Sequence, residues 1–426
     1  MNINPTMRIR DRVISVRNSE DGRVLVQNFA YLSLLQIAGY IFPLVTLPYL
    51  ARVIGVESFG KIAFAAAIIG WFQTIADWGF NYTATRDVAI HREDKQMVSM
   101  IFSNVLWARC LLAFFSLVAL LLLIYIVPSF SEMSTLLLLT FLQIPGQILF
   151  PEWFFQAMEK MKYITILSLI SKMFFTIAVF VFITEESHFI LQPLFISLGF
   201  LVSGIVALYY ILVRWGFKLV KPNFTGVFET LKSSTDVFIN NLMPNLYSSF
   251  SIFLLGMYGG TVSTGKLDAG NKFMKMGQQF IAIISRTFFP YLSRKIGRHG
   301  LFSKINLLIS LLISLVLFGF APLIIKLFFT SEFYDAIIVL QILSISILFL
   351  SLSSIFGTNY LIIQGHEKKL RNVTSFSSII GFLISFPLIY YFDYIGAAIT
   401  ITLTRGIMGL SVLLLANRIR TSKLPI

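Results

Sequence analysis

Residues 98–127 read VSMIFSNVLWARCLLAFFSLVALLLLIYIV, a long apolar run with a single charge, Arg109. A helix rises about 1.5 Å per residue and the hydrocarbon core of a bilayer is about 30 Å thick, so this stretch can cross a membrane. Eleven further apolar stretches occur at residues 25–50, 59–84, 133–156, 164–184, 188–213, 233–258, 263–289, 304–329, 334–363, 372–392 and 395–416. The sequence therefore predicts an all-α polytopic membrane protein with twelve transmembrane helices.

Positive charge is concentrated in every second connection between these stretches. Of the 34 Lys and Arg residues, 24 lie in the termini and the even-numbered connections, and four lie at or near the opposite ends of the stretches. Because Lys and Arg accumulate on the cytoplasmic side, we expect both termini in the cytoplasm. This topology explains the net charge of +14 without a nucleic-acid partner. The single cysteine, Cys110, leaves no disulfide framework.

Two short motifs recur and indicate that the chain is duplicated. Residues 156–160 (QAMEK) resemble residues 364–368 (QGHEK) at an offset of 208, and residues 59–62 (FGKI) resemble residues 264–267 (TGKL) at an offset of 205. An offset of six helices relates halves of the same membrane orientation, and such transporters place the substrate path between the halves. We expect a cytoplasmic segment at 1–24, a six-helix half at 25–213, a linker at 214–232, a second half at 233–416 and a tail at 417–426.

The eighth stretch carries a polar face. Asp268, Lys272, Lys275, Gln279 and Arg286 follow one another at spacings that place all five on one side of a helix. A charged side chain facing lipid costs at least about 2.5–3.5 kcal/mol at mid-bilayer, so this side meets protein or water. It is either a buried ion-pair network, in which Asp268 and Lys272 pair across one turn, or a cationic cavity face. Three cations against one carboxylate favour the cavity.

Three other stretches carry weaker polar faces. They contribute Gln36 and Tyr40 in the first, Asp77 and Asn81 in the second, and Asn241 and Asn245 in the seventh, beside Pro244. Such residues also mediate ordinary helix–helix contacts in membranes. However, stretches 1 and 2 are the equivalents of stretches 7 and 8 in a duplicated chain. We therefore predict that these residues line the same substrate cavity as the eighth stretch.

Two carboxylates are candidates for ion coupling, if transport uses an ion gradient. Asp268 has Lys272 one turn away, which holds it ionised, whereas Asp77 has only neutral neighbours on its own helix face. Burial without a partner favours the protonated form, so we favour Asp77 as the proton site. The alternative is that Asp77 pairs with a cation from another helix.

Other polar groups indicate no enzyme chemistry. Arg109, Glu152 and Lys172 lie toward the cytoplasmic ends of stretches 3, 4 and 5, where they either neutralise one another or face the cavity. Residues 260–266 spell G-x-x-x-x-G-K, but Leu267 replaces the Ser or Thr that would bind magnesium, and no strand precedes the motif. The four histidines show no metal-ligand spacing. We expect no catalytic residues, no metal and no cofactor.

Four motifs resemble the O-antigen flippases of the multidrug/oligosaccharidyl-lipid/polysaccharide (MOP) exporter superfamily. They are PYLARVIG at 48–55 with FG at 59–60, ADWGFN at 76–81, PEWFFQAMEKM at 151–161 and PYL at 290–292. The resemblance implies two pseudo-symmetric six-helix bundles around a V-shaped cavity. It also implies transport of undecaprenyl-pyrophosphate-linked oligosaccharide between the leaflets of the bacterial inner membrane, with membrane lipid and the polysaccharide polymerase machinery as partners.

Two other functions remain open at this point. A multidrug exporter of the same superfamily commonly carries cationic substrates and would need an acidic cavity, unlike the cationic face of stretch 8. A membrane polymerase or ligase for the same glycans needs a sizeable outer loop for its catalytic residues, and no outer connection here exceeds about ten residues.

Overall fold

The computed structural model of the protein describes residues 20–294 and 296–421, in which every regular element is a helix. The first half contains α2 (Glu20–Asp77), α3 (Phe80–Ile90), α4 (Lys95–Ile126), α5 (Pro128–Glu132), α6 (Ser134–Phe141), α7 (Gln143–Leu149), α8 (Glu152–Ala157), α9 (Met161–Phe182), η1 (Glu186–Ile190), α10 (Leu191–Tyr209) and η2 (Tyr210–Arg214). The second half contains α11 (Phe224–Leu242), η3 (Met243–Leu246), α12 (Ser249–Tyr258), α13 (Gly260–Arg294), η4 (Ile296–Arg298), α14 (His299–Gly319), α15 (Ala321–Phe328), η5 (Ser331–Phe333), α16 (Ala336–Leu352), η6 (Ser353–Ile362) and α17 (Glu367–Thr421).

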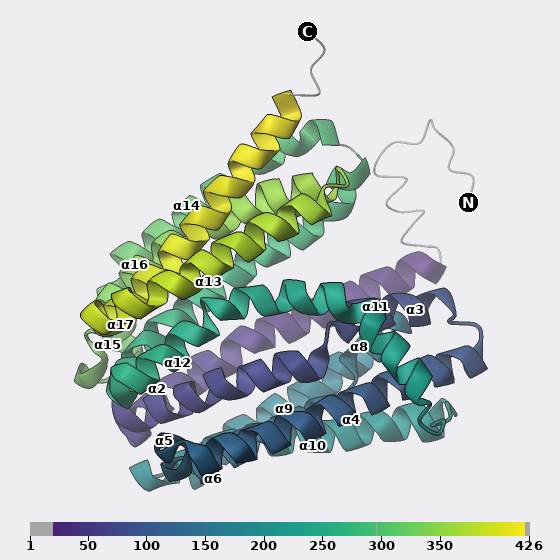
Figure 1. Ribbon diagram of the computed structural model, residues 1–426, viewed down its shortest axis with the longest axis horizontal. Coiled ribbons are helices and arrows are strands. Elements are labelled where there is room, and N and C mark those ends of the chain that lie inside the picture. The colour runs from purple at the N-terminus through teal and green to yellow at the C-terminus, as the bar shows by residue number, and fades with distance from the viewer. Residues whose placement is uncertain (1–19, 295, 422–426) are drawn as a thin grey trace.

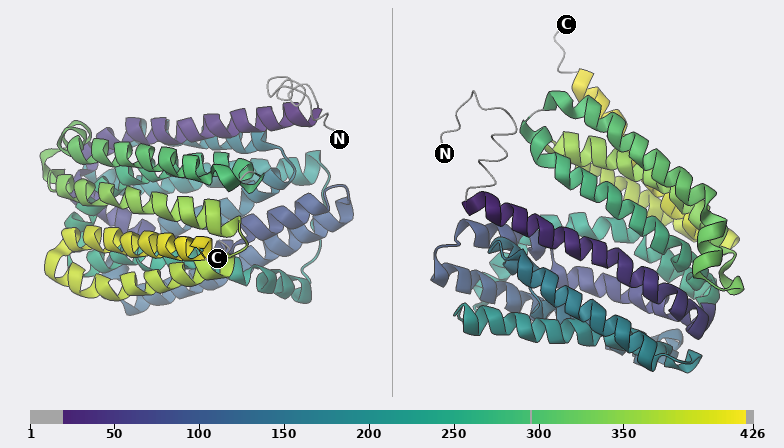
Figure 2. Two further views of the ribbon diagram at one scale, coloured as in Figure 1. Left: turned by 90° about the horizontal axis from the view of Figure 1, so that it is seen from above. Right: turned by 180° about the vertical axis from the view of Figure 1, so that it is seen from behind.

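The helices of the two halves lie on opposite sides of the molecule. In Figure 1, α2 to α10 form the lower group, and α13 to α17 form the upper group, with α11 and α12 running between them. The two groups come together near α15 and diverge toward the start of α2 and the end of α17. Figure 2 shows from behind that the first part of α2 lies along the side of its group that faces the second half.

Two of the long helices are pairs joined by a sharp backbone break. α2 breaks at Gly55, whose φ is 67°, and α17 breaks at Asp393, whose φ is 51°. At Gly55 the positive φ costs little, because glycine has no Cβ. Pro244 follows the end of α11 and lies in the 3-10 helix η3, whereas Pro43 is accommodated within α2.

Eight helical segments among the described residues are long and apolar enough to cross a membrane. They run over Ala30–Ile90, Lys95–Ile126, Ser134–Ala157, Met161–Phe182, Glu186–Arg214, His299–Gly319, Ala336–Ile362 and Glu367–Thr421. The first and last contain the breaks at Gly55 and Asp393, so each holds two predicted stretches, and the eight segments overlap ten of the twelve. The other two correspond to α11–α12, which is interrupted, and to α13, which carries the predicted charged face.

Backbone features recur in the two halves at a nearly constant offset. Gly55 and Gly260 both have positive φ, at an offset of 205 residues, and each precedes the helix that opens with a recurring glycine motif. Glu159 and Gly365 also both have positive φ, at an offset of 206. In each half, the N–H of the next residue donates to the carbonyl five positions earlier. Lys160 donates to Phe155 and His366 to Leu361, both at 2.8 Å. These caps support the predicted duplication, and they align residues 156–160 with the second half at an offset of 206 rather than 208.

The motif at residues 151–161 builds the core of the first half. Trp153, Phe154 and Phe155 are at most 2% exposed and pack with Phe102 and Phe217. The apolar block thus holds α8 against α4 and fixes the position of Glu152, the first residue of α8.

Candidate functional site

A cavity of about 650 Å³ lies between the first half and α13. It follows the first part of α2 from Leu35 to Ile54 and includes Phe59 and Ile62 after the break in this helix. The remainder of its wall comes from Phe150, α8, α9, α10 and α13. Six of the ten residues predicted to line a substrate cavity do so: Gln36, Tyr40, Asp268, Lys272, Lys275 and Gln279.

The α13 wall carries most of the predicted charge. Lys272 Nζ lies 2.6 Å from Asp268 Oδ2, so the ion pair considered from the sequence is present, and both partners line the cavity. Lys275 is exposed to the cavity, and among the described residues no carboxylate lies within ion-pair distance of its Nζ. The wall therefore offers one ammonium group that is free to meet an anion.

The first part of α2 meets α13 across the cavity. Gln36 Nε2 donates to Gln279 Oε1 at 2.9 Å and to the Tyr40 hydroxyl at 3.1 Å. The Tyr40 ring stacks on Phe280, with centroids 5.4 Å apart. These contacts join stretch 1 of the first half to stretch 8 of the second half beside the ion pair of α13.

Two charged residues of the first half complete the wall, Glu152 of α8 and Lys172 of α9. Glu152 interacts electrostatically with Lys172, although the two do not form an ion pair within 4 Å. The sequence-based expectation left open whether they neutralise a cluster or face the cavity. The structure places both on the cavity. A sequence signal was present, because Ser168, Ser171, Lys172 and Phe175 have the spacing of one helix face, and all four line the cavity.

Four predicted residues lie outside this cavity. Arg286 is on the predicted face of α13 but about 16 Å beyond Lys275 along the helix, where it is exposed. Asn81 and Asn241 are exposed, and Asn245 Nδ2 donates to Thr74 Oγ1 at 2.8 Å. These four residues therefore do not line this cavity with Lys275, and their role in binding substrate stays a prediction.

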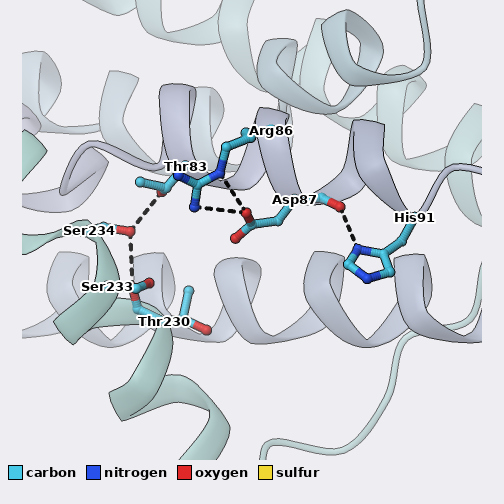
Figure 3. A network of polar contacts seen from close by, with 7 residues as sticks. All are labelled: Thr83, Arg86, Asp87, His91, Thr230, Ser233 and Ser234. Atoms are coloured by element: carbon cyan, nitrogen blue, oxygen red, sulfur yellow. Dashed lines mark hydrogen bonds and ion pairs between the residues drawn. The ribbon is translucent and has the colours of Figure 1, made fainter. Parts of the chain in front are cut away.

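Stretches 2 and 7 pack directly on each other and do not form a cavity wall between them. The Trp78 ring stacks on Phe238 with centroids 3.9 Å apart, and the Thr83 and Ser234 hydroxyls meet at 2.7 Å. Figure 3 shows this hydroxyl pair joining α3 to α11, beside the local Arg86–Asp87 ion pair. Polar residues on these helices thus mediate helix contact, which was the alternative weighed from the sequence.

Asp77 forms an ion pair with Arg109 of α4. The alternative weighed from the sequence, in which Asp77 pairs with a cation from another helix, is therefore the one present. The periodicity of its own helix could not reveal this partner. The Arg109 side chain is 6% exposed and the Asp77 side chain 25% exposed, and Asp77 does not line the cavity.

Arg405 of α17 is buried without a carboxylate partner among the described residues. Its guanidinium donates to Ser346 Oγ at 2.9 Å and to Gln278 Oε1 at 3.2 Å, and it contacts the Met274 sulfur at 2.9 Å. It therefore supports α13 from a flank outside the cavity and adds positive charge near Lys275.

One end of the cavity is sealed by backbone contact between the halves; we call it the closed end. A β-carbon added at Gly60 would lie 1.7 Å from the Thr261 carbonyl oxygen, and one added at Gly265 would lie 2.4 Å from the Val56 carbonyl oxygen. Gly60 and Gly265 are the equivalent glycines of the duplicated motif, so the contact is reciprocal. Phe59 adds edge contacts to Phe329 and Phe333, and Lys272 Nζ lies 4.9 Å from the centre of its ring.

The Val56 N–H at the closed end donates to Glu332 Oε2 at 3.3 Å. This carboxylate of the second half therefore caps the helix that restarts after Gly55 in the first half.

Comparison with known proteins agrees with this architecture. Residues 25–295 match the family model described as polysaccharide biosynthesis protein. A relative from Escherichia coli (strain K12), named provisionally as an O-antigen transporter, is 28% identical over 89% of this chain and 94% of its own length. A relative of the same name from Shigella dysenteriae is 25% identical over 91% of this chain and 98% of its own.

Two solved structures share the fold. The lipid II flippase MurJ, in an inward closed conformation, superposes with a TM-score of 0.74 at 16% identity, covering 92% of this chain and 87% of MurJ. An inward-facing multidrug resistance MATE transporter of the MOP superfamily gives 0.69 at 14% identity, covering 93% and 98%. With the family match, these likenesses show that the chain belongs to the polysaccharide biosynthesis protein family and has the fold of MOP-superfamily transporters.

Proposed function

We propose that the protein is a flippase that moves an undecaprenyl-pyrophosphate-linked oligosaccharide from the inner to the outer leaflet of the bacterial inner membrane. The observation that carries this proposal is Lys275, a cation without an ion-pair partner on the wall of an intramembrane cavity. A charge in this position is costly unless it meets water or a counter-charge, which makes such residues markers of a substrate path. A pyrophosphate supplies that counter-charge.

The fold does not distinguish this substrate from a cationic drug, because a multidrug transporter shares it. The charges of the cavity favour the pyrophosphate. Its wall carries Lys172, Lys272 and Lys275 against Glu152 and Asp268, which leaves a net charge of +1. The names of the two O-antigen transporter relatives support a glycan-bearing substrate.

For the membrane arrangement we propose twelve spans in two six-helix bundles, with both termini in the cytoplasm. In this orientation the closed end faces the periplasm, and the lipid-linked substrate enters from the cytoplasmic side. Transport by alternating access then requires the Gly60–Gly265 contact to part and the opposite end to close. For ion coupling we now favour Asp268 over Asp77, because Asp268 lines the cavity and Asp77 is paired outside it.

The test is replacement of Lys275 by Ala in cells whose own copy of the gene is deleted. A charge-assisted contact contributes about 1.5–3 kcal/mol, so glycan export should fall by about 10- to 150-fold while the protein still inserts at normal levels. The matched control is Arg298→Ala, which removes an exposed cation outside the cavity and should leave export unchanged. Full export by Lys275→Ala at normal protein level would exclude the proposed role of this cavity.

A further inference from the structure

The cavity is divided into two electrostatically different walls. On the α13 wall, Asp268, Lys272 and Lys275 interact with one another and leave a net positive charge. On the first-half wall, Glu152 and Lys172 interact with each other, and together they carry no net charge. An anionic head group is thus attracted to the α13 wall, and the first-half wall must serve a part of the ligand that is polar but uncharged.

The first-half wall carries hydrogen-bonding groups that the protein itself does not use. Many helical serines of this chain donate to the carbonyl four residues earlier, as Ser103 does to Ser99 at 2.7 Å. Ser168 and Ser171 of α9 line the cavity and, within the described part of the chain, make no hydrogen bond. Gln192 of α10 also lines it, and its Oε1 is buried without a partner. A buried polar atom is costly when unsatisfied, so Gln192 Oε1 requires a hydrogen-bond donor from a ligand or water, and the two serine hydroxyls are available to the same ligand.

Aromatic rings lie on the same wall as these polar groups. Phe150, Phe175 and Phe200 line the cavity from α7–α8, α9 and α10, whereas the α13 wall presents Met276 and no aromatic ring. A sugar ring has hydroxyl groups that both donate and accept hydrogen bonds and a C–H face that packs on apolar surfaces. A wall that combines free hydroxyls, an amide, one carboxylate, one ammonium and aromatic rings matches this chemistry.

We propose that Glu152, Ser168, Ser171, Lys172 and Gln192 form the saccharide-binding wall of the cavity and determine which glycan is accepted. The inference rests on the proposed function. It assigns the two chemical parts of the substrate to different halves of the protein. The pyrophosphate lies against Lys272 and Lys275 of α13, and the first sugars lie against α8, α9 and α10. Glycan selectivity then depends on first-half residues, whereas affinity for the anionic lipid depends on α13.

The test compares two ligands on the full-length protein in nanodiscs. One is the undecaprenyl-pyrophosphate-linked oligosaccharide extracted from the cells that make the protein, and the other is undecaprenyl pyrophosphate without sugar. The variant Ser168→Ala/Ser171→Ala/Gln192→Ala should bind the glycan-bearing lipid about 10- to 100-fold more weakly and bare undecaprenyl pyrophosphate within about twofold of wild type. Lys275→Ala should weaken the binding of both.

Controls separate a local effect from misfolding. Ser233→Ala removes an exposed hydroxyl outside the cavity and should bind both ligands like wild type. If the triple variant weakens both ligands equally, or neither, the saccharide wall is refuted. If the wild type binds both ligands with equal affinity, the wall is also refuted, but the flippase proposal stands. If the wild type binds neither ligand, the flippase proposal fails and the saccharide wall fails with it.

Discussion

Replacing Gly60 by Ala should force the closed end apart. The added β-carbon would lie 1.7 Å from the Thr261 carbonyl oxygen and 2.8 Å from the Gly265 nitrogen. An ordinary carbon–oxygen contact is about 3.3 Å or more, so the two helices must separate by about 1.6 Å. Because the obstructing atoms belong to the backbone, no side-chain rotation relieves the clash.

The steric clash destabilises only the conformation in which the closed end is sealed, because the Gly60–Thr261 contact exists only when the two halves meet there. Overpacking costs about 1–3 kcal/mol, which shifts the balance between closed and open states about 5- to 150-fold toward opening. Gly265→Ala should act in the same direction, because its β-carbon would lie 2.4 Å from the Val56 carbonyl oxygen.

Opening can be measured by thiol labelling of intact cells. Cys110 is first replaced by Ala, and Ile54, which is fully buried and lines the cavity, is replaced by Cys as the reporter. A membrane-impermeant thiol reagent added outside should label Cys at position 54 faster in the Gly60→Ala variant.

Gly70→Ala is the matched control, because Gly70 lies in the same helix and nothing approaches its added β-carbon within 4 Å. Equal labelling of the Gly60 and Gly70 variants, at equal protein levels, would refute the reasoning.

Three further predictions follow from the charges and the proposed topology. Asp77→Asn leaves Arg109 buried without its partner, so the protein in detergent should lose about 3–5 kcal/mol of stability, and a second substitution, Arg109→Gln, should restore part of it. An unchanged melting temperature of the Asp77→Asn variant would contradict the role of the ion pair. Asp268→Asn should remove any dependence of transport on a pH gradient in proteoliposomes, and a persisting dependence would exclude Asp268 from coupling. Reporter fusions at Ser131 and Ser187 should be periplasmic, and cytoplasmic signals at both would overturn the twelve-span arrangement.

Local patterns were sufficient to predict the class of the protein. Apolar runs longer than a bilayer crossing predicted the all-helical membrane fold, and the family match confirmed the resemblance found in motifs such as residues 151–161. The 205-residue repeat located the Gly60–Gly265 pair, because a duplicated chain repeats its motifs at a constant offset. The charged face of α13 was also predictable, since helical periodicity determines which residues share a side.

Only the tertiary structure decided what each helix face meets. Periodicity placed Arg286 on the same face as Lys275, but the cavity ends near Gln279, and Arg286 lies beyond it. The same reasoning could not decide whether Asp77 has a partner on another helix, and the structure shows Arg109 of α4 in that position. It also assigned stretches 2 and 7 to a cavity, whereas Trp78 stacks directly on Phe238. The physical reason is that a sequence determines the direction of a side chain around its own helix, while its partner and its depth in the cavity depend on helices distant in the chain.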